Sequence, residues 1–207
     1  GSQGMSLMYD AISQTDRAAA IETARQRSLA WLAAMQVPGA PRGVMRISAA
    51  QDYARWPGVS LYGTYNGIMC LDLIGGLDSF SEAERAALVA WLEEHRRLDG
   101  IVRVPGMTGE AVFKKPDRDE TWRYIDFHVT NYTLGAIDAL EPGRRPNLTF
   151  ARPFLDPLKL KAWLADRDLN DPWQEGNNIV NLASFFLLLR RDGDAVWALR
   201  LAAGSNV

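Results

Sequence analysis

Apolar residues recur along the chain with helical spacing, and one triplet appears three times. Ala-Trp-Leu stands at residues 30–32, 90–92 and 162–164. Each copy lies toward the end of a stretch in which apolar residues return every three or four positions, as on one face of a helix. A loop with Gly or Pro follows, and then a more uniformly apolar stretch. This order predicts a repeat in which an amphipathic outer helix alternates with a buried inner helix.

The pattern predicts helix boundaries as well. A capping box at Ser81 and Glu84 opens one outer helix, and Asp156 followed by Pro157 opens another. Between the helices we expect extended pieces at 44–47 and 101–104, and a long charged loop at 105–120. We expect outer helices at 15–35, 81–97 and from 157 to before 170, inner helices at 62–74, 127–140 and 177–190, and the start of a further outer helix at 194–203.

These elements predict an all-α fold. We expect an α/α toroid, in the form of an incomplete barrel built from about three outer-inner helical hairpins. Residues 1–4 resemble a tag remnant ahead of Met5, and residues 5–207 form one domain. Because the last outer helix has no inner partner, the chain can be a fragment, and an additional domain or a homodimer can complete the toroid.

Composition excludes several classes of function. The chain has 207 residues, of which 47% are hydrophobic, and its net charge of −2 provides no basic surface for nucleic acid. No apolar run reaches the roughly 18 residues that span a bilayer, so we expect no membrane partner. Cys70 is the single cysteine, which excludes an internal disulfide. With no secretory signal pattern, we expect a cytoplasmic protein.

Polar and aromatic residues lie at the N-terminal ends of the predicted inner helices, which we call their openings. If these helices run parallel, their N-termini meet at one end of a cavity, where unpaired N–H groups favour an anionic ligand. Trp122 and Trp173 lie in loops ahead of two inner helices, where they can carry sugar rings or isoprenoid chains or pack the loops onto the core. Trp31, Trp91 and Trp163 are expected to pack between helices. The candidate binding residues at the openings are Tyr65, Asn66, His128, Asn131, Tyr132, Asn177, Asn178 and Asn181.

The stretch from Trp91-Leu92 through Asp99-Gly100 into an apolar helix resembles the repeats of α/α toroids such as terpenoid cyclases and protein prenyltransferases. The Asp-x-Asp-Asp acid of the cyclases is absent. The residues most similar to the prenyltransferase zinc ligands are Cys70 and Asp72, but their order along the chain is reversed. We therefore expect no metal and no cofactor.

The polar inner-helix openings are also similar in composition to the sites of α/α-toroid polysaccharide lyases. That resemblance implies catalytic roles for three residues: Asn131 would hold a uronate carboxylate, and His128 and Tyr132 would move protons. Asn177-Asn178 fits the double asparagine of some such lyases, although Ile179 stands where a His often follows.

Three hypotheses about function follow. The first is a carbohydrate-active or carbohydrate-binding domain, with acidic glycans as one candidate ligand class at the N-terminal ends of the inner helices. The second is a terpenoid-cyclase-like domain that binds an apolar or isoprenoid ligand. The third is a non-catalytic interaction module of a larger protein. The sequence leaves open whether the protein is an enzyme; if it is, a polysaccharide lyase or related glycan-processing enzyme is expected.

Overall fold

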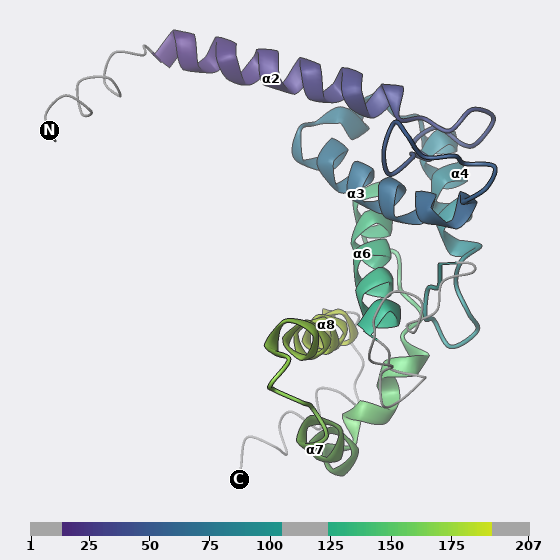
Figure 1. Ribbon diagram of the computed structural model, residues 1–207, viewed down its shortest axis with the longest axis vertical. Coiled ribbons are helices and arrows are strands. Elements are labelled where there is room, and N and C mark those ends of the chain that lie inside the picture. Colours follow the sequence, from purple (N-terminus) through teal and green to yellow (C-terminus); the bar gives the residue numbers. More distant parts are fainter. Residues whose placement is uncertain (1–13, 105–123, 192–207) are drawn as a thin grey trace, which may run out of the picture.

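The computed structural model describes residues 14–104 and 124–191, and this part of the chain is helical, with no β-strand (Figure 1). Its α-helices are α2 (Gln14–Ala34), α3 (Ser60–Leu73), α4 (Glu82–Glu93), α6 (Tyr124–Leu140), α7 (Pro157–Ala165) and α8 (Pro172–Arg191). Shorter 3-10 turns are η1 (Pro57–Val59), η2 (Gly76–Ser79) and η4 (Thr149–Leu155). The expected all-α class is confirmed.

Helix starts follow the capping residues. Ser81 accepts a hydrogen bond from the N–H of Glu84, and the Glu84 carboxylate accepts from the N–H of Ser81, which is the predicted capping box. The Asp156 side chain caps α7, with Pro157 as its first residue. Asp171 accepts a hydrogen bond from the N–H of Gln174 at the start of α8. This helix therefore begins at Pro172, five residues earlier than the predicted 177.

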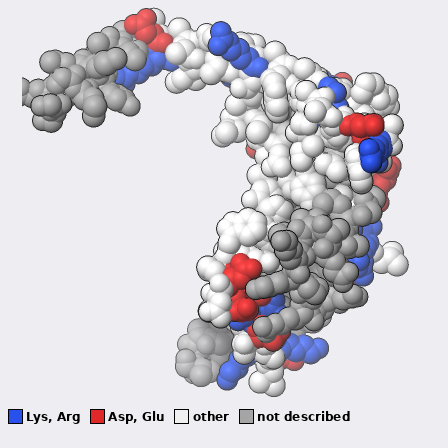
Figure 2. All heavy atoms as spheres, viewed as in Figure 1, with Lys and Arg blue, Asp and Glu red and all other residues white. Residues whose placement is uncertain are grey.

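The helices form an open arc rather than a closed ring over the described residues (Figures 1 and 2). Helix α6 packs against both α3 and α8, and α4 also packs on α6. Figure 1 shows α6 running along the long axis while α8 is seen nearly end-on, so these helices are not the parallel set that the sequence analysis expected. Figure 2 shows a hollow between the α2 end and the α8 end, with a mostly uncharged visible surface.

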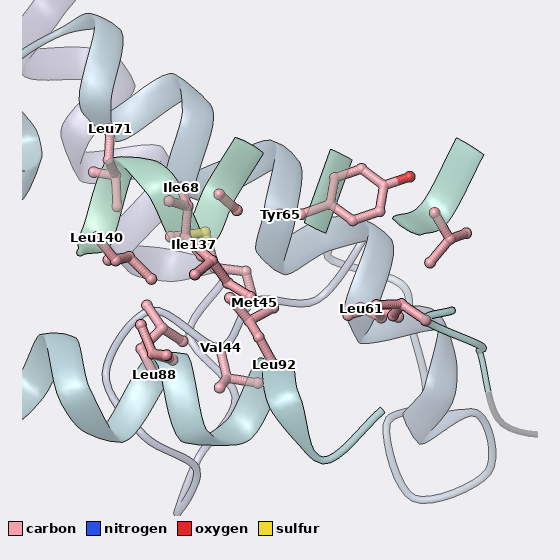
Figure 3. Packing of buried hydrophobic residues seen from close by; sticks show 14 of the residues in the cluster. Val44, Met45, Leu61, Tyr65, Ile68, Leu71, Leu88, Leu92, Ile137 and Leu140 are labelled. Atoms are coloured by element: carbon pink, nitrogen blue, oxygen red, sulfur yellow. The ribbon is translucent and has the colours of Figure 1, made fainter. Parts of the chain in front are cut away.

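Two hydrophobic clusters hold the arc together, and α6 contributes to both. The first contains Leu61 and Ile68 of α3, Leu88 and Leu92 of α4, and Ile137 of α6, and Figure 3 shows Ile68 close to Ile137. The second joins α6 to η4, α7 and α8 through a set of buried aromatic side chains: Phe127, Phe150, Phe154, Trp163 and Phe185. Helix α6 is thus the central element of the fold.

The sequence repeat has a structural counterpart in the turns after α2 and α4. Gln36 pairs with Met45 in an isolated antiparallel bridge after α2, and Arg96 pairs with Val102 after α4. The N–H of Met45 donates to Thr64 Oγ1 of α3 at 2.9 Å, and the N–H of Val102 donates to Thr130 Oγ1 of α6 at 2.8 Å. A buried threonine therefore holds the first turn to α3 and the second turn to α6.

Several sequence predictions need correction. Helix α4 ends at Glu93 rather than at 97, because the chain tightens into a turn in which the N–H groups of His95 and Arg96 bond carbonyls three residues back. The segments 44–47 and 101–104 form only the isolated bridges. Trp163 is buried, but Trp31 is 58% exposed and is not a packing residue between helices. The predicted loop at 105–120 and helix at 194–203 lie outside the described residues.

Candidate functional site

A continuous path of aromatic ring contacts connects α3, α6 and α8. Adjacent ring centroids along it lie 4.5 to 5.7 Å apart, within the range of favourable aromatic pairs. The path crosses from α3 to α6 between Tyr65 and Tyr132, and from α6 to α8 between Tyr124 and Trp173. We call this set the aromatic cluster; its members in order are Tyr62, Tyr65, Tyr132, His128, Tyr124 and Trp173.

Helical spacing explains how α6 supplies the centre of the cluster. Tyr124, His128 and Tyr132 stand four residues apart, so they share one face of the helix. Tyr124 is buried, while His128 and Tyr132 are half-buried. Trp173, in the first turn of α8, is 64% exposed. The cluster therefore runs from the interior to an exposed indole.

Burial shifts the pKa values of four members of the cluster. Burial lowers the pKa of His128, which keeps its ring neutral near pH 7, and no hydrogen-bond partner is present for its buried Nδ1 atom. Burial, together with the neighbouring tyrosines, raises the pKa of Tyr65. The pKa values of Tyr62 and Tyr124 are raised for the same reasons. These phenols are thus proton donors rather than phenolates at neutral pH.

Asparagines lie beside the cluster on α6 and α8. Asn131 Nδ2 donates to Asn181 Oδ1 at 2.9 Å. Asn181 is 4% exposed, and its buried Nδ2 has no hydrogen-bond partner. Asn178 is fully buried; its Nδ2 donates to Glu175 while its Oδ1 has no partner. Amide groups with unused donors and acceptors are costly inside a protein unless water or a ligand satisfies them.

The acidic side chains next to the cluster are neutralised by arginines. Arg103 makes two hydrogen bonds, of 2.9 and 2.7 Å, to the carboxylate of Asp126, which is buried in the first turn of α6. Arg167 lies 3.3 Å from the Glu175 carboxylate and stacks on the ring of Trp163. These carboxylates are occupied in ion pairs.

The remaining predicted site residues are placed differently from what was expected. Asn66 is exposed and donates to the Tyr62 carbonyl of its own helix. Asn177 likewise donates to the Trp173 carbonyl, and Trp173 lies within α8 instead of in a loop before it. Asn177, Asn178 and Asn181 occupy the second and third turns of α8, because the helix starts earlier than predicted. Trp122 lies outside the described residues.

Tyr124 belongs to the site but was not among the residues predicted from the sequence. Tyr124 contacts both His128 and Trp173, and so joins the α6 and α8 parts of the cluster. The signal was present, since Tyr124 precedes His128 by one helical turn. It was overlooked because the helix was predicted to begin at Phe127. Arg103 and Arg167 could not be identified as partners without the fold.

Within residues 14–104 and 124–191, no group of three or more His, Cys, Asp or Glu side chains is arranged to hold a metal ion. None of the helices in these ranges is long and apolar enough to cross a bilayer. No model of a known protein family, no curated protein and no solved structure matches the chain. Its function is therefore inferred from its own residues.

Proposed function

We propose that the protein binds a carbohydrate at the aromatic cluster and the neighbouring asparagines of α6 and α8. The observation that carries this proposal is the unbroken path of rings from Tyr62 to Trp173, flanked by the Asn131–Asn181 pair. Sugars present apolar C–H faces and a rim of hydroxyl groups. The exposed ring of Trp173 and the half-buried rings of Tyr62, His128 and Tyr132, beside the half-buried amide of Asn131, complement both.

Charge at this surface favours a polyhydroxylated ligand over a strongly charged one. The imidazole of His128 is kept neutral, and Arg103 and Arg167 are paired with Asp126 and Glu175. A purely apolar or isoprenoid ligand fits less well, because binding it would desolvate the polar groups of the cluster without replacing their hydrogen bonds.

Cleavage of an acidic glycan is the second candidate, favoured by the contact between His128 and Tyr132 at 4.5 Å between ring centroids. In such a β-elimination, neutral His128 takes the proton from C5 of a uronate. The C5 electrons form the C4=C5 double bond as the C4–O bond breaks, and Tyr132 protonates the departing oxygen. The amide of Asn131 would hold the uronate carboxylate.

A ligand screen tests the proposal. The thermal midpoint of the purified protein is measured with neutral oligosaccharides, uronate oligosaccharides and isoprenoid diphosphates, since a ligand at about 100 times its Kd stabilises the folded state by roughly 2.7 kcal/mol. The proposal predicts a rise with a glycan, and new unsaturated ends with a uronate if the protein cleaves it. A response confined to isoprenoid diphosphates would contradict it.

A further inference from the structure

A cleft of about 760 Å³ lies away from the aromatic cluster, between α2 and the chain that follows α3. Figure 1 shows α2 running over α3 at this end of the arc. Its volume is in the range of small-molecule sites. The apolar part of its wall is made by Leu29, Leu32, Met45, Leu71 and Phe80.

Glycines create the floor of the cleft. Helix α3 ends at Leu73, and Gly75 then adopts a φ of 72°, a conformation that other residues rarely take. A Cβ atom on Gly76 would lie 2.6 Å from Leu71 and 2.8 Å from Leu29. The chain therefore turns sharply beneath α2, and only glycine fits at position 76 between the side chains of Leu71 and Leu29, which are part of the cleft wall.

Two arginines, Arg25 and Arg42, also line the cleft. Arg25 Nη1 donates to the carbonyl of Ile74, which fixes the guanidinium at the rim, while its other nitrogens bond the exposed carboxylate of Glu22 at 3.0 and 3.2 Å. Arg42 stacks on the Phe80 ring at 4.0 Å. The Arg25–Glu22 pair is exposed, and exposed pairs are weak, so another carboxylate can replace Glu22.

We propose that this cleft binds a single-chain aliphatic carboxylate, a ligand of the fatty-acid class. The hydrocarbon chain covers Leu29, Leu71 and Phe80, and the carboxylate takes the place of Glu22 on the guanidinium of Arg25. Asp78, which also lines the cleft, excludes ligands with several negative charges. The site is separate from the aromatic cluster, so it stands whether or not the protein binds a glycan.

Calorimetric titrations with octanoate, decanoate and dodecanoate, each below its micelle concentration, test the proposal. Burial of each added methylene strengthens binding by up to about fourfold. Dodecanoate should bind more tightly than 1-dodecanol. Arg25→Gln should remove that preference and keep the dependence on chain length, whereas Glu22→Gln should strengthen dodecanoate binding because it releases Arg25.

Filling the cleft provides the matched control. Ala33 lines the cleft and Ala30 does not, and both are exposed on α2. Ala33→Trp should weaken dodecanoate binding at least tenfold, whereas Ala30→Trp should leave it unchanged. If the Ala33→Trp variant does not fold, Ala33→Leu fills the cleft with a smaller side chain. Affinity that does not depend on chain length, or equal effects of substitutions at 33 and 30, would overturn the proposal.

Discussion

Asn131 Nδ2 donates a hydrogen bond to Asn181 Oδ1 across the contact between α6 and α8, at 2.9 Å. The two residues are 50 positions apart, and Asn181 is almost completely buried. Together with the contact between Tyr124 and Trp173, this bond joins the half-buried face that carries His128 and Tyr132 to α8. It makes Asn131 part of the fold as well as part of the candidate site.

The Asn131→Ala variant should therefore lose stability, because it leaves the buried Oδ1 of Asn181 without a donor. The expected loss is about 1–3 kcal/mol in the free energy of unfolding. Urea unfolding of Asn131→Ala, Asn181→Ala and the double variant measures the coupling. Losses that simply add would show that the two amides do not interact.

The threonines that fasten the turns provide a second prediction, with its control on the same helix. Thr130 Oγ1 accepts from the N–H of Val102, whereas Thr133 Oγ1 is buried with no partner. Thr130→Val should cost about 1–3 kcal/mol, because it leaves a buried N–H unpaired. Thr133→Val should be neutral or stabilising, because valine replaces an unsatisfied hydroxyl with a methyl group. Denaturant midpoints that fall equally in both variants would refute the role of Thr130.

The lowered pKa of His128 predicts the pH dependence of stability. The unfolded ring titrates near pH 6.5 and the folded ring below that value, so between the two pKa values the unfolded state binds the extra proton. The contribution of His128 is fully present above about pH 6.5. It is lost as the pH falls toward the folded pKa, at up to about 1.4 kcal/mol per pH unit.

The measurement for His128 compares unfolding at about pH 7.5 and about pH 5 for the wild type and His128→Gln. The variant should lose less stability on acidification than the wild type. If both lose the same amount, the imidazole of His128 is not responsible for the pH dependence.

The start of α8 can be tested through its cap. Asp171 accepts from the N–H of Gln174, as Asp156 accepts from the N–H of Leu158 in α7. Asp171→Ala should cost about 1 kcal/mol, similar to Asp156→Ala, because each removes an N-cap. A helix that began at 177 would leave Asp171→Ala close to neutral in thermal unfolding.

The sequence predicted the helix caps whose hydrogen bonds join residues close together in the chain. Ser81 and Asp156 were recognised as caps because the residues they bond lie two or three positions away. Asp171 followed by Pro172 has the same form as Asp156 followed by Pro157, so the sequence also carried a signal for the start of α8. Because the helix was predicted to begin at 177 instead, three asparagines were placed in the wrong turn of α8.

Hydrogen bonds and ion pairs between residues far apart in the chain could not be predicted from these local sequence patterns. Thr64 and Thr130 are ordinary residues in an apolar helix until the preceding turn places an N–H beside each hydroxyl. The pairing of Arg103 with Asp126 spans 23 positions and depends on how the turn after α4 lies against the start of α6. The alternation of helices was predictable from periodicity, whereas their directions depend on how side chains from both clusters pack around α6.

Binding of a glycan to two tryptophan variants tests the central claim most directly. Trp173 belongs to the aromatic cluster and Trp31 does not, yet their exposed fractions are similar, at 64% and 58%. Calorimetric titration with the oligosaccharide that raises the thermal midpoint most should show at least tenfold weaker binding for Trp173→Ala, about 1.4 kcal/mol, and unchanged binding for Trp31→Ala. Equal affinities in both variants and the wild type would contradict a carbohydrate site at the aromatic cluster.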